Sequence, residues 1–301
     1  MKSSAESMIK GLEEFGFVFT SSQQLSEGKY LSADVEWNYN DVPHLHEVHE
    51  LAEAVQGAVE DDYASAILIQ KVGLLSFPLT LFNCAISRSE NFYFTSLGPY
   101  VLLIRTKWST ENQTTSVVTT YFLGSSKALK LSHKLIHRLL GKNYRTLMEK
   151  DLAMRSRRGN LRLRNYSFSG DLTGNGFLES LNLAKFGVIA PADLSLFSWE
   201  CSIGNIQQGT TVVGSDDNSG VRLVRQDYLL KVFPRICMHA GASLDKTEFE
   251  GSCIVCPWHG KLIKPIFAID LSKDPETYES SGIRVEIKNS MVYVSGSYNS
   301  Q

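Results

Sequence analysis

Long hydrophobic runs are missing from this sequence. The longest, VGLLSFPLTLF at residues 72–82, contains Pro78 and is too short to cross a bilayer. The first segment, residues 1–17, carries Glu6 early and has no apolar stretch of signal-peptide length. These absences argue against a membrane partner, and we expect a cytoplasmic protein.

Cysteine is also scarce. The chain has 5 cysteines in 301 residues, an odd and unevenly spaced set. Secreted disulfide frameworks usually use an even number. The pattern therefore argues against such a framework and favours a metal-binding or redox role. The five are Cys84, Cys201, Cys237, Cys253 and Cys256.

The chain also lacks a strong charge bias. Its formal net charge is −2, and its 43% hydrophobic and 21% charged residues are typical of a globular protein. Nothing in this charge predicts nucleic acid as a partner. There is no G-x-G-x-x-G motif for a flavin or nicotinamide cofactor. The length fits two domains.

The first part of the chain mixes helical and strand patterns. Residues 3–15 predict a short amphipathic helix, and the alternation over 27–39 predicts a strand. A helix capped by Asn40 or Asp41 is predicted to run through residues 44–59, with Pro43 in its first turn. Residues 63–82 are apolar and fit a strand or a helix equally well.

The next segments are easier to interpret. Three β-rich runs at 91–97, 100–108 and 114–124 predict neighbouring strands of an antiparallel sheet. They are followed by a long basic helix at 125–159 that ends at Gly159. The exposed face of this helix is typical of a solvated surface, although an acidic ferredoxin is an alternative partner.

From Leu196 onward the pattern changes to short strands separated by turn residues, such as GVRLVRQD, YLLKVFPRI and GIRVEIKN. Such spacing predicts a small all-β module. We therefore expect an α+β chain, with one domain at residues 1–187 and an all-β domain at 188–301.

The strongest motif lies in this second part. Cys237, His239, Cys256 and His259 follow the pattern C-x-H-x16-C-x2-H. Two thiolates and two imidazoles suit tetrahedral zinc or a Rieske [2Fe–2S] cluster. Zinc fingers usually pair ligands of one kind, whereas each half here supplies one cysteine and one histidine. That division favours the cluster, with zinc as the alternative.

Both half-motifs, CMHAGASL and CPWHG, resemble those of the Rieske iron–sulfur proteins over residues 196–301. Their glycines and proline suggest tight turns that bring backbone N–H groups towards the sulfides. The resemblance favours the oxygenase-type cluster over the respiratory one, which places an extra disulfide-forming cysteine in each loop, whereas here Leu244 and Trp258 are non-cysteine residues close to the ligands. Cys253 is interpreted as a buried apolar residue.

A second motif lies in NYNDVPHLHEVH at residues 38–49. Asn38, Asp41, His44 and His49 follow the spacing N-x-x-D-x-x-H-x4-H, which resembles the mononuclear iron motif of Rieske non-haem iron oxygenases. Such iron needs two neutral imidazoles and one carboxylate on one face. His46 is interpreted as a non-ligand. Considered without the Rieske motif, the stretch reads as a polar surface helix.

The resemblance implies a role for Asp41 as well. In that family the equivalent residue bridges a mononuclear-iron histidine to a cluster histidine of the neighbouring subunit, here His239 or His259, and so gives electrons a path. Asp41 is also placed to fix the tautomer of His44.

The third iron ligand is expected on the long helix. Asp151 is our choice and Glu149 the second candidate, since the family takes its carboxylate from a later helix. The alternative for Asp151 is a surface acid that pairs with Arg155. His133 and His137 share a helix face, but without an accompanying acid they predict a packed or solvated pair.

The sequence therefore predicts a Rieske-type non-haem iron oxygenase with a reversed domain order. The resemblance implies a helix-grip-like N-terminal domain, in which an antiparallel sheet wraps a helix over an apolar cavity. It also implies a ferredoxin or NAD(P)H-dependent reductase as electron donor, O2, a small organic substrate and a homotrimer. Candidate cavity walls are Phe77, Phe82, Phe92, Tyr93, Phe94 and Tyr100.

Two alternatives to the oxygenase are open. One is a Rieske electron-transfer protein fused to a domain that binds a small molecule or lipid, which needs nothing at residues 44, 49 and 151. The other is a zinc hydrolase built on the N-terminal histidines, for which no base or nucleophile stands out.

Overall fold

The computed structural model describes most of the chain and divides it into two compact units. The first comprises residues 1–159 and 174–181, and the second comprises 160–173 and 182–301. The expected domain boundary after residue 187 lies outside the described residues. The described residues are 5–41, 44–49, 53–59, 63–72, 75–87, 89–164, 166, 168, 197–214, 220–273, 276–280 and 282–296.

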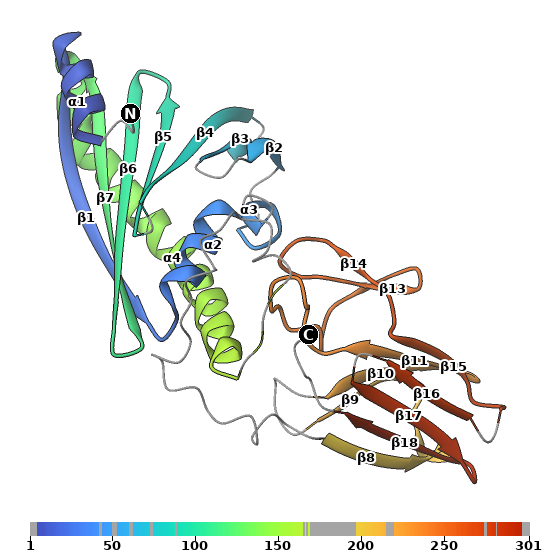
Figure 1. The fold of residues 1–301 in the computed structure, drawn as a ribbon. Coiled ribbons are helices and arrows are strands. Elements are labelled where there is room, and N and C mark those ends of the chain that lie inside the picture. The colour runs from blue at the N-terminus through green and yellow to red at the C-terminus, as the bar shows by residue number, and fades with distance from the viewer. Residues whose placement is uncertain are drawn as a thin grey trace. The chain divides into compact units, whose positions relative to one another are not determined.

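The first unit is built on a seven-stranded antiparallel sheet of order β1-β7-β6-β5-β4-β3-β2 (Figure 1). Its strands are β1 (Phe17–Gly28), β2 (Glu53–Val59), β3 (Tyr63–Val72), β4 (Leu75–Ser87), β5 (Glu90–Leu97), β6 (Tyr100–Glu111) and β7 (Thr114–Ser126). The helices are α1 (Ala5–Glu14), α2 (Ser32–Asn40), α3 (His44–Glu47) and α4 (His133–Arg162), with a 3-10 helix, η1, at Lys127–Ser132.

The long helix α4 packs on strands β6 and β7 of this sheet. Tyr144 and Met148 of α4 form a buried cluster with Leu102 of β6 and Tyr121 of β7. A sheet that holds one long helix on its concave side is the helix-grip arrangement expected from the sequence. No helix among the described residues is long and apolar enough to cross a membrane.

The strands predicted at 91–97, 100–108 and 114–124 are confirmed as β5, β6 and β7. Burial alternates along β7, so one face of the strand is directed to the interior. A two-residue turn joins β6 to β7, and its residues Asn112 and Gln113 both have positive φ, as type I′ hairpins require.

Two predictions for the segment before β2 are wrong. The strand expected over 27–39 is instead the end of β1 followed by α2, whose Asp34 accepts a hydrogen bond from the Leu31 backbone N–H at 3.2 Å. The helix expected over 44–59 stops at Glu47, and β2 pairs with β3 from Glu53 onward. Pairing partners distant in sequence override the local pattern.

The long basic helix begins later and ends later than predicted. Residues 127–132 form η1, and α4 continues past Gly159 to Arg162. Gly159 lies within the helix, at the position where the Tyr30 backbone packs against α4. A Cβ at this position would come within 2.7 Å of Tyr30 Cα. This glycine therefore allows close approach of two backbones and is not a helix stop.

The second unit is all-β, as predicted. Two four-stranded sheets have the orders β15-β11-β10-β9 and β16-β17-β18-β8, and a three-stranded sheet has the order β12-β13-β14. Buried side chains from both four-stranded sheets form one core, which includes Leu223, Val232, Val285 and Val292. The strands are β8 (Phe197–Ser202), β9 (Gly209–Val213), β10 (Val221–Gln226), β11 (Leu229–Pro234), β12 (Phe249–Glu250), β13 (Cys253–Val255), β14 (Leu262–Ile263), β15 (Phe267–Asp270), β16 (Glu276–Ser280), β17 (Ile283–Lys288) and β18 (Met291–Gly296).

Candidate metal centre and iron–sulfur domain

A cavity of about 220 Å³ lies in the first unit between the sheet and helices α2, α3 and α4. Most of its walls are apolar or aromatic, and the three expected iron ligands lie among them. The lining residues are Asn38, Tyr39, Asp41, His44, Leu45, His49, Leu81, Asn83, Tyr93, Ile104, Thr106, Thr119, Tyr121, Tyr144, Leu147, Met148 and Asp151.

His44 begins the short helix α3 and is buried. Its Nδ1 contacts the backbone carbonyl oxygen of Asp41 and lies 3.7 Å from the Asp41 carboxylate. A carbonyl oxygen can only accept, so Nδ1 carries the hydrogen in this contact. The Nε2 atom, 3.6 Å from Asp151 Oδ1, is then the nitrogen available to a metal.

His49 lies in the turn that follows α3. Its Nε2 is 2.9 Å from Asp151 Oδ1, and its ring centroid is 5.1 Å from that of His44. The two histidines converge because the helix ends between them, and no bent helix is needed. The turn is held by Lys150, whose Nζ donates to the Val48 carbonyl at 2.7 Å.

Asp151 is on the face of α4 that points into the cavity, and it is only 5% exposed. The alternative of a surface acid is therefore wrong. Its ion pair with Arg155 does form, with 3.8 Å between Arg155 Nη2 and Asp151 Oδ2, but the guanidinium is also fully buried. Glu149, the second candidate, is exposed.

Asn38 connects Asp151 to Arg155. The Asn38 amide donates to Asp151 Oδ1 at 3.4 Å, and its carbonyl oxygen accepts from Arg155 Nε at 2.8 Å. Arg155 Nη2 donates to the same oxygen. The guanidinium also lies over the Tyr39 ring, 4.8 Å from its centroid. The sequence included Asn38 in the motif but gave no sign of its contact with Arg155.

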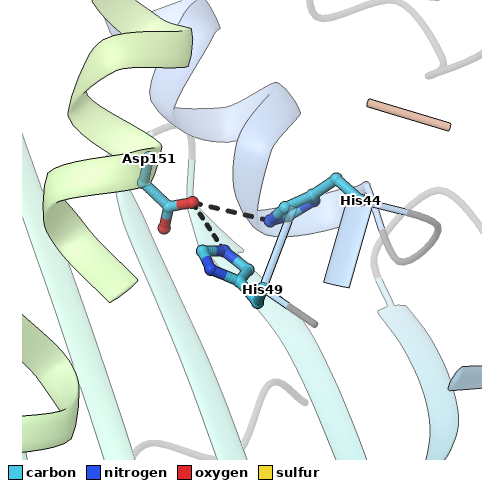
Figure 2. A group of neighbouring side chains, drawn as sticks. All are labelled: His44, His49 and Asp151. Atoms are coloured by element: carbon cyan, nitrogen blue, oxygen red, sulfur yellow. Dashed lines mark hydrogen bonds and ion pairs between the residues drawn. The ribbon is translucent and has the colours of Figure 1, made fainter. Parts of the chain in front are cut away.

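Figure 2 shows His44, His49 and Asp151 directed towards one another. Their ligand atoms all lie within 4.8 Å of one another. Ligand atoms roughly 2 Å from a common ion are at most about 4 Å apart. The distances from His44 Nε2 and His49 Nε2 to Asp151 Oδ1, 3.6 and 2.9 Å, are both shorter than that. Two imidazoles and one carboxylate are the donor set of a mononuclear iron site.

The ionisation of these groups is strongly coupled. Burial alone would raise the pKa of Asp151, but the contacts with His44 and His49 and the charge of Arg155 hold that pKa far below its usual range. Burial alone would lower the pKa of His44, yet the carboxylates of Asp151 and Asp41 raise it. An ionised acid next to imidazoles favours a bound cation.

Among the expected aromatic wall residues whose side chains the structure describes, only Tyr93 lines the cavity, so the prediction is wrong for Phe82, Phe92, Phe94 and Tyr100. Phe82 stacks on Phe94, and Phe92 belongs to a separate cluster with Leu103. The Tyr100 hydroxyl contacts Ser132 at 2.7 Å. These strands have two faces, and an aromatic run alternates between them. The Phe77 side chain lies outside the described residues.

His133 and His137 are a packed pair, as predicted. The Thr20 hydroxyl lies 2.8 Å from His133 Nδ1 and 2.9 Å from His137 Nε2. Ser125 and Ser22 contact the remaining ring nitrogens at 2.7 and 2.9 Å. All four ring nitrogens therefore have hydroxyl partners and fix the start of α4 against β1 and β7.

In the second unit, two turns place the cysteine–histidine motif around one point. Cys237 and Cys256 are buried, and the His239 and His259 rings lie 4.7 Å apart. In each turn, the backbone N–H groups that follow the cysteine point at its sulfur. These groups come from His239 and Ala240 at Cys237, and from Trp258 and His259 at Cys256.

These residues fit a Rieske cluster. His259 Nδ1 lies 3.8 Å from Cys256 Sγ. His239 Nδ1 is buried and has no hydrogen-bond partner among the described residues, as a ligand nitrogen would without its metal. The backbone N–H groups that point at the two sulfurs act to lower the pKa of both thiols and favour the thiolates that bind iron.

The turns are supported by two buried arginines that the sequence did not indicate. Arg222 Nη1 donates to the Thr247 carbonyl at 3.0 Å, and Arg235 pairs with Asp245 at 2.7 Å. All five cysteines, each in the described part of the chain, are free of disulfides. Cys253 is half-buried, not fully buried as expected.

Comparison with known families agrees with this geometry. Residues 198–268 match the family model of the Rieske [2Fe-2S] domain. A Rieske [2Fe-2S] domain is therefore found in this chain. It contains the four residues of the motif, and such domains carry electrons on a cluster. No curated protein matches the chain.

Similar solved structures include three aromatase/cyclases. The chain is 9% identical to the di-domain ARO/CYC BexL from the BE-7585A biosynthetic pathway, with a TM-score of 0.40 over 45% of this chain and 49% of that one. The chain is 8% identical to the di-domain ARO/CYC StfQ from the steffimycin biosynthetic pathway, with a TM-score of 0.43 over 50% of this chain and 55% of that one. It is 11% identical to the Zhui aromatase/cyclase from Streptomyces sp. R1128, with a TM-score of 0.40 over 47% of this chain and 96% of that one. The chain thus spans about half the length of the di-domain proteins.

Proposed function

We propose that the chain is a Rieske-type non-haem iron oxygenase that inserts oxygen from O2 into a small, largely apolar organic substrate. The observation that carries this proposal is the convergence of His44, His49 and Asp151 in the wall of an apolar cavity. A Rieske domain in the same chain supports it, because it supplies single electrons to a second centre.

In this proposal His44 Nε2, His49 Nε2 and the Asp151 carboxylate hold the mononuclear iron. Such an iron leaves coordination positions open for O2. Asn38 and Arg155 orient the carboxylate and keep it ionised, while the Asp41 carbonyl fixes the tautomer of His44. The apolar walls exclude water and place the substrate next to the metal.

The Rieske cluster is held by Cys237, His239, Cys256 and His259, and it passes single electrons. Asp41 would bridge His44 to His239 or His259 of a neighbouring copy, within a homotrimer, and so give electrons a path between the two metal sites. Its carboxylate lies 3.7 Å from His44, which supports this role. A separate ferredoxin or NAD(P)H-dependent reductase reduces the cluster.

Metal analysis tests the proposal. Anaerobically purified chain should hold three irons, two in the cluster and one in the mononuclear site, and show a Rieske EPR signal after reduction with dithionite. His44→Ala should lose the third iron and keep the signal. His46→Ala is the matched control from the same stretch and should retain all three irons.

A result of two irons, unchanged by His44→Ala, would refute the oxygenase. The alternative is then a Rieske electron-transfer protein fused to a small-molecule- or lipid-binding domain, an activity that the apolar cavity supports. Zinc in the chain without an EPR signal would refute both functions.

A further inference from the structure

Three exposed leucines lie at the start of α4. Leu135 and Leu139 are four residues apart and therefore share one side of the helix. Leu131 precedes them by another four residues in η1, which leads directly into α4. Leu131, Leu135 and Leu139 are 95%, 61% and 54% exposed. We call these three residues the leucine ridge.

The packing of α4 explains why the ridge faces outwards. His133 and His137 hold this part of the helix against β1 and β7. Leu135 and Leu139 each follow one of these histidines by two residues, which is about 200° around a helix of 3.6 residues per turn. The ridge is therefore on the side of α4 away from the sheet, where the described residues leave it uncovered.

Six exposed cations accompany the ridge. They are Lys127, Lys130, Lys134, Arg138, Lys142 and Arg145. None of the six forms an ion pair within the described part of the chain. No acidic residue occurs between Glu111 and Glu149, although the net charge of the whole chain is −2. Positive charge is therefore concentrated locally, beside exposed apolar side chains.

An exposed aromatic residue lies at the same end of the sheet. Phe15, which is 85% exposed, is in the turn between α1 and β1. Phe17 pairs with Ser126 at the end of the β1–β7 ladder, and η1 begins at the next residue, Lys127. Phe15 and the start of the leucine ridge are therefore close to the same pair of strand ends.

Leucines next to unpaired lysines favour a lipid surface as the partner. Helices that lie on membranes combine lysine and arginine with leucine or phenylalanine that enters the acyl boundary. Lysine also buries its stem while its ammonium group stays in water. Protein interfaces are depleted in lysine, yet four of the six cations are lysines. A symmetric pair of chains would bring like charges together at this face.

We infer that this face docks the chain on a lipid bilayer that contains anionic lipids. The leucine ridge and Phe15 enter the acyl boundary, and the six cations contact the headgroups. A helix that lies on a bilayer needs no spanning run, so the lack of long hydrophobic runs does not oppose this docking. The docking goes beyond the proposed function and does not depend on it.

Vesicle sedimentation of the full-length chain tests the inference. The vesicles are phosphatidylcholine with and without about 30% phosphatidylserine. Each cation near an anionic surface strengthens binding about fivefold, so binding to phosphatidylcholine alone should be at least about 100-fold weaker. Lys130→Gln, Lys134→Gln and Arg138→Gln together should weaken binding to the anionic vesicles about 100-fold. Leu131→Gln and Leu135→Gln together should weaken it at least about tenfold.

These variants should remain folded, because the positions are exposed and glutamine has a helix propensity close to those of leucine, lysine and arginine. Leu25→Gln is the matched control for the ridge, since Leu25 of β1 is 63% exposed. Three exposed lysines of the second unit, changed together, are the control for charge: Lys264→Gln, Lys273→Gln and Lys288→Gln. Both controls should bind anionic vesicles like the unchanged chain.

Three results would overturn the inference. The first is no binding to the anionic vesicles, and the second is an equal loss of binding in the test and control variants. The third is binding that depends on the cations but not on the leucines, because a purely electrostatic face would serve an acidic protein such as a ferredoxin equally well.

Discussion

Replacement of Arg155 by methionine should strongly destabilise the first unit at neutral pH. The guanidinium is fully buried, lies 3.8 Å from the Asp151 carboxylate and donates to Asn38. At an effective dielectric constant of about 20, two charges at this distance interact by roughly 4 kcal/mol. Loss of one partner of a buried pair costs about 3–5 kcal/mol, because the remaining charge stays buried.

The cost has an upper limit set by protonation. Without Arg155 the Asp151 carboxyl can take up a proton, and at pH 7 this costs about 4 kcal/mol for a group whose unfolded pKa is about 3.9. We therefore expect Arg155→Met to lower the free energy of unfolding by about 2–4 kcal/mol at pH 7. Because Asp151 has a depressed pKa in the folded chain, its contribution is present above its unfolded pKa and fades as the pH falls below it. In the variant, protonating Asp151 costs about 1.4 kcal/mol less for each pH unit down to its unfolded pKa, so the destabilisation should shrink as the pH falls towards 4.

Urea denaturation of metal-free protein, followed by the fluorescence of Trp37 and Trp108 in the first unit, measures this effect. Asp151→Asn in the same background should restore part of the loss, because it removes the buried negative charge that Arg155 no longer balances. Arg105→Met is the control: its pairs with Glu6 and Glu90 are partly exposed, so about 1 kcal/mol or less should be lost. Additive effects of Arg155→Met and Asp151→Asn, or a loss that does not change with pH, would refute the reasoning.

Three further predictions follow from other parts of the structure. Asp151 and Asp41 outweigh the effect of burial and raise the pKa of His44, so the affinity for cobalt, measured by calorimetry, should fall about tenfold per pH unit below that pKa. Asp41→Asn should move the pH at which this fall begins to a lower value. An unchanged pH would contradict the role of Asp41. Gly159→Ala should lower the free energy of unfolding, measured in denaturant, by about 1–3 kcal/mol, since its Cβ would meet the Tyr30 and Lys29 backbones. Gly141→Ala, whose Cβ would meet only the Gln24 side-chain nitrogen at 2.9 Å, should be neutral or stabilising. Equal effects of the two substitutions would disprove the close packing at Gly159. Cys253→Ser should keep the Rieske EPR signal and Cys256→Ser should lose it, and loss in both would mean that Cys253 supports the cluster.

Several features were readable from local sequence because their causes are local. The Cys-x-His and Cys-x-x-His turns contain their own ligands and their own N–H donors, so their spacing and their resemblance to Rieske proteins indicated a Rieske domain. The strands β5 to β7 carry alternating β-branched and aromatic residues. The packed histidines of α4 were also anticipated.

Other features depended on contacts between distant segments. Alternation over 27–39 predicted a strand, but Asp34 pairs with Arg158 inside the first unit, and both are fully buried in the helical arrangement. The aromatic run of β4 to β6 predicted cavity walls, yet of the expected residues whose side chains the structure describes only Tyr93 lines the cavity. No local pattern carries this information.

The sequence by itself determined the Rieske motif, the α+β composition and the identity of three candidate iron ligands. Only the tertiary structure brought His44, His49 and Asp151 within 4.8 Å of one another and buried Arg155 behind them. The reason is physical: His49 and Asp151 are 102 residues apart, and such contacts form only when α4 packs on the sheet and buries the apolar surface that drives folding.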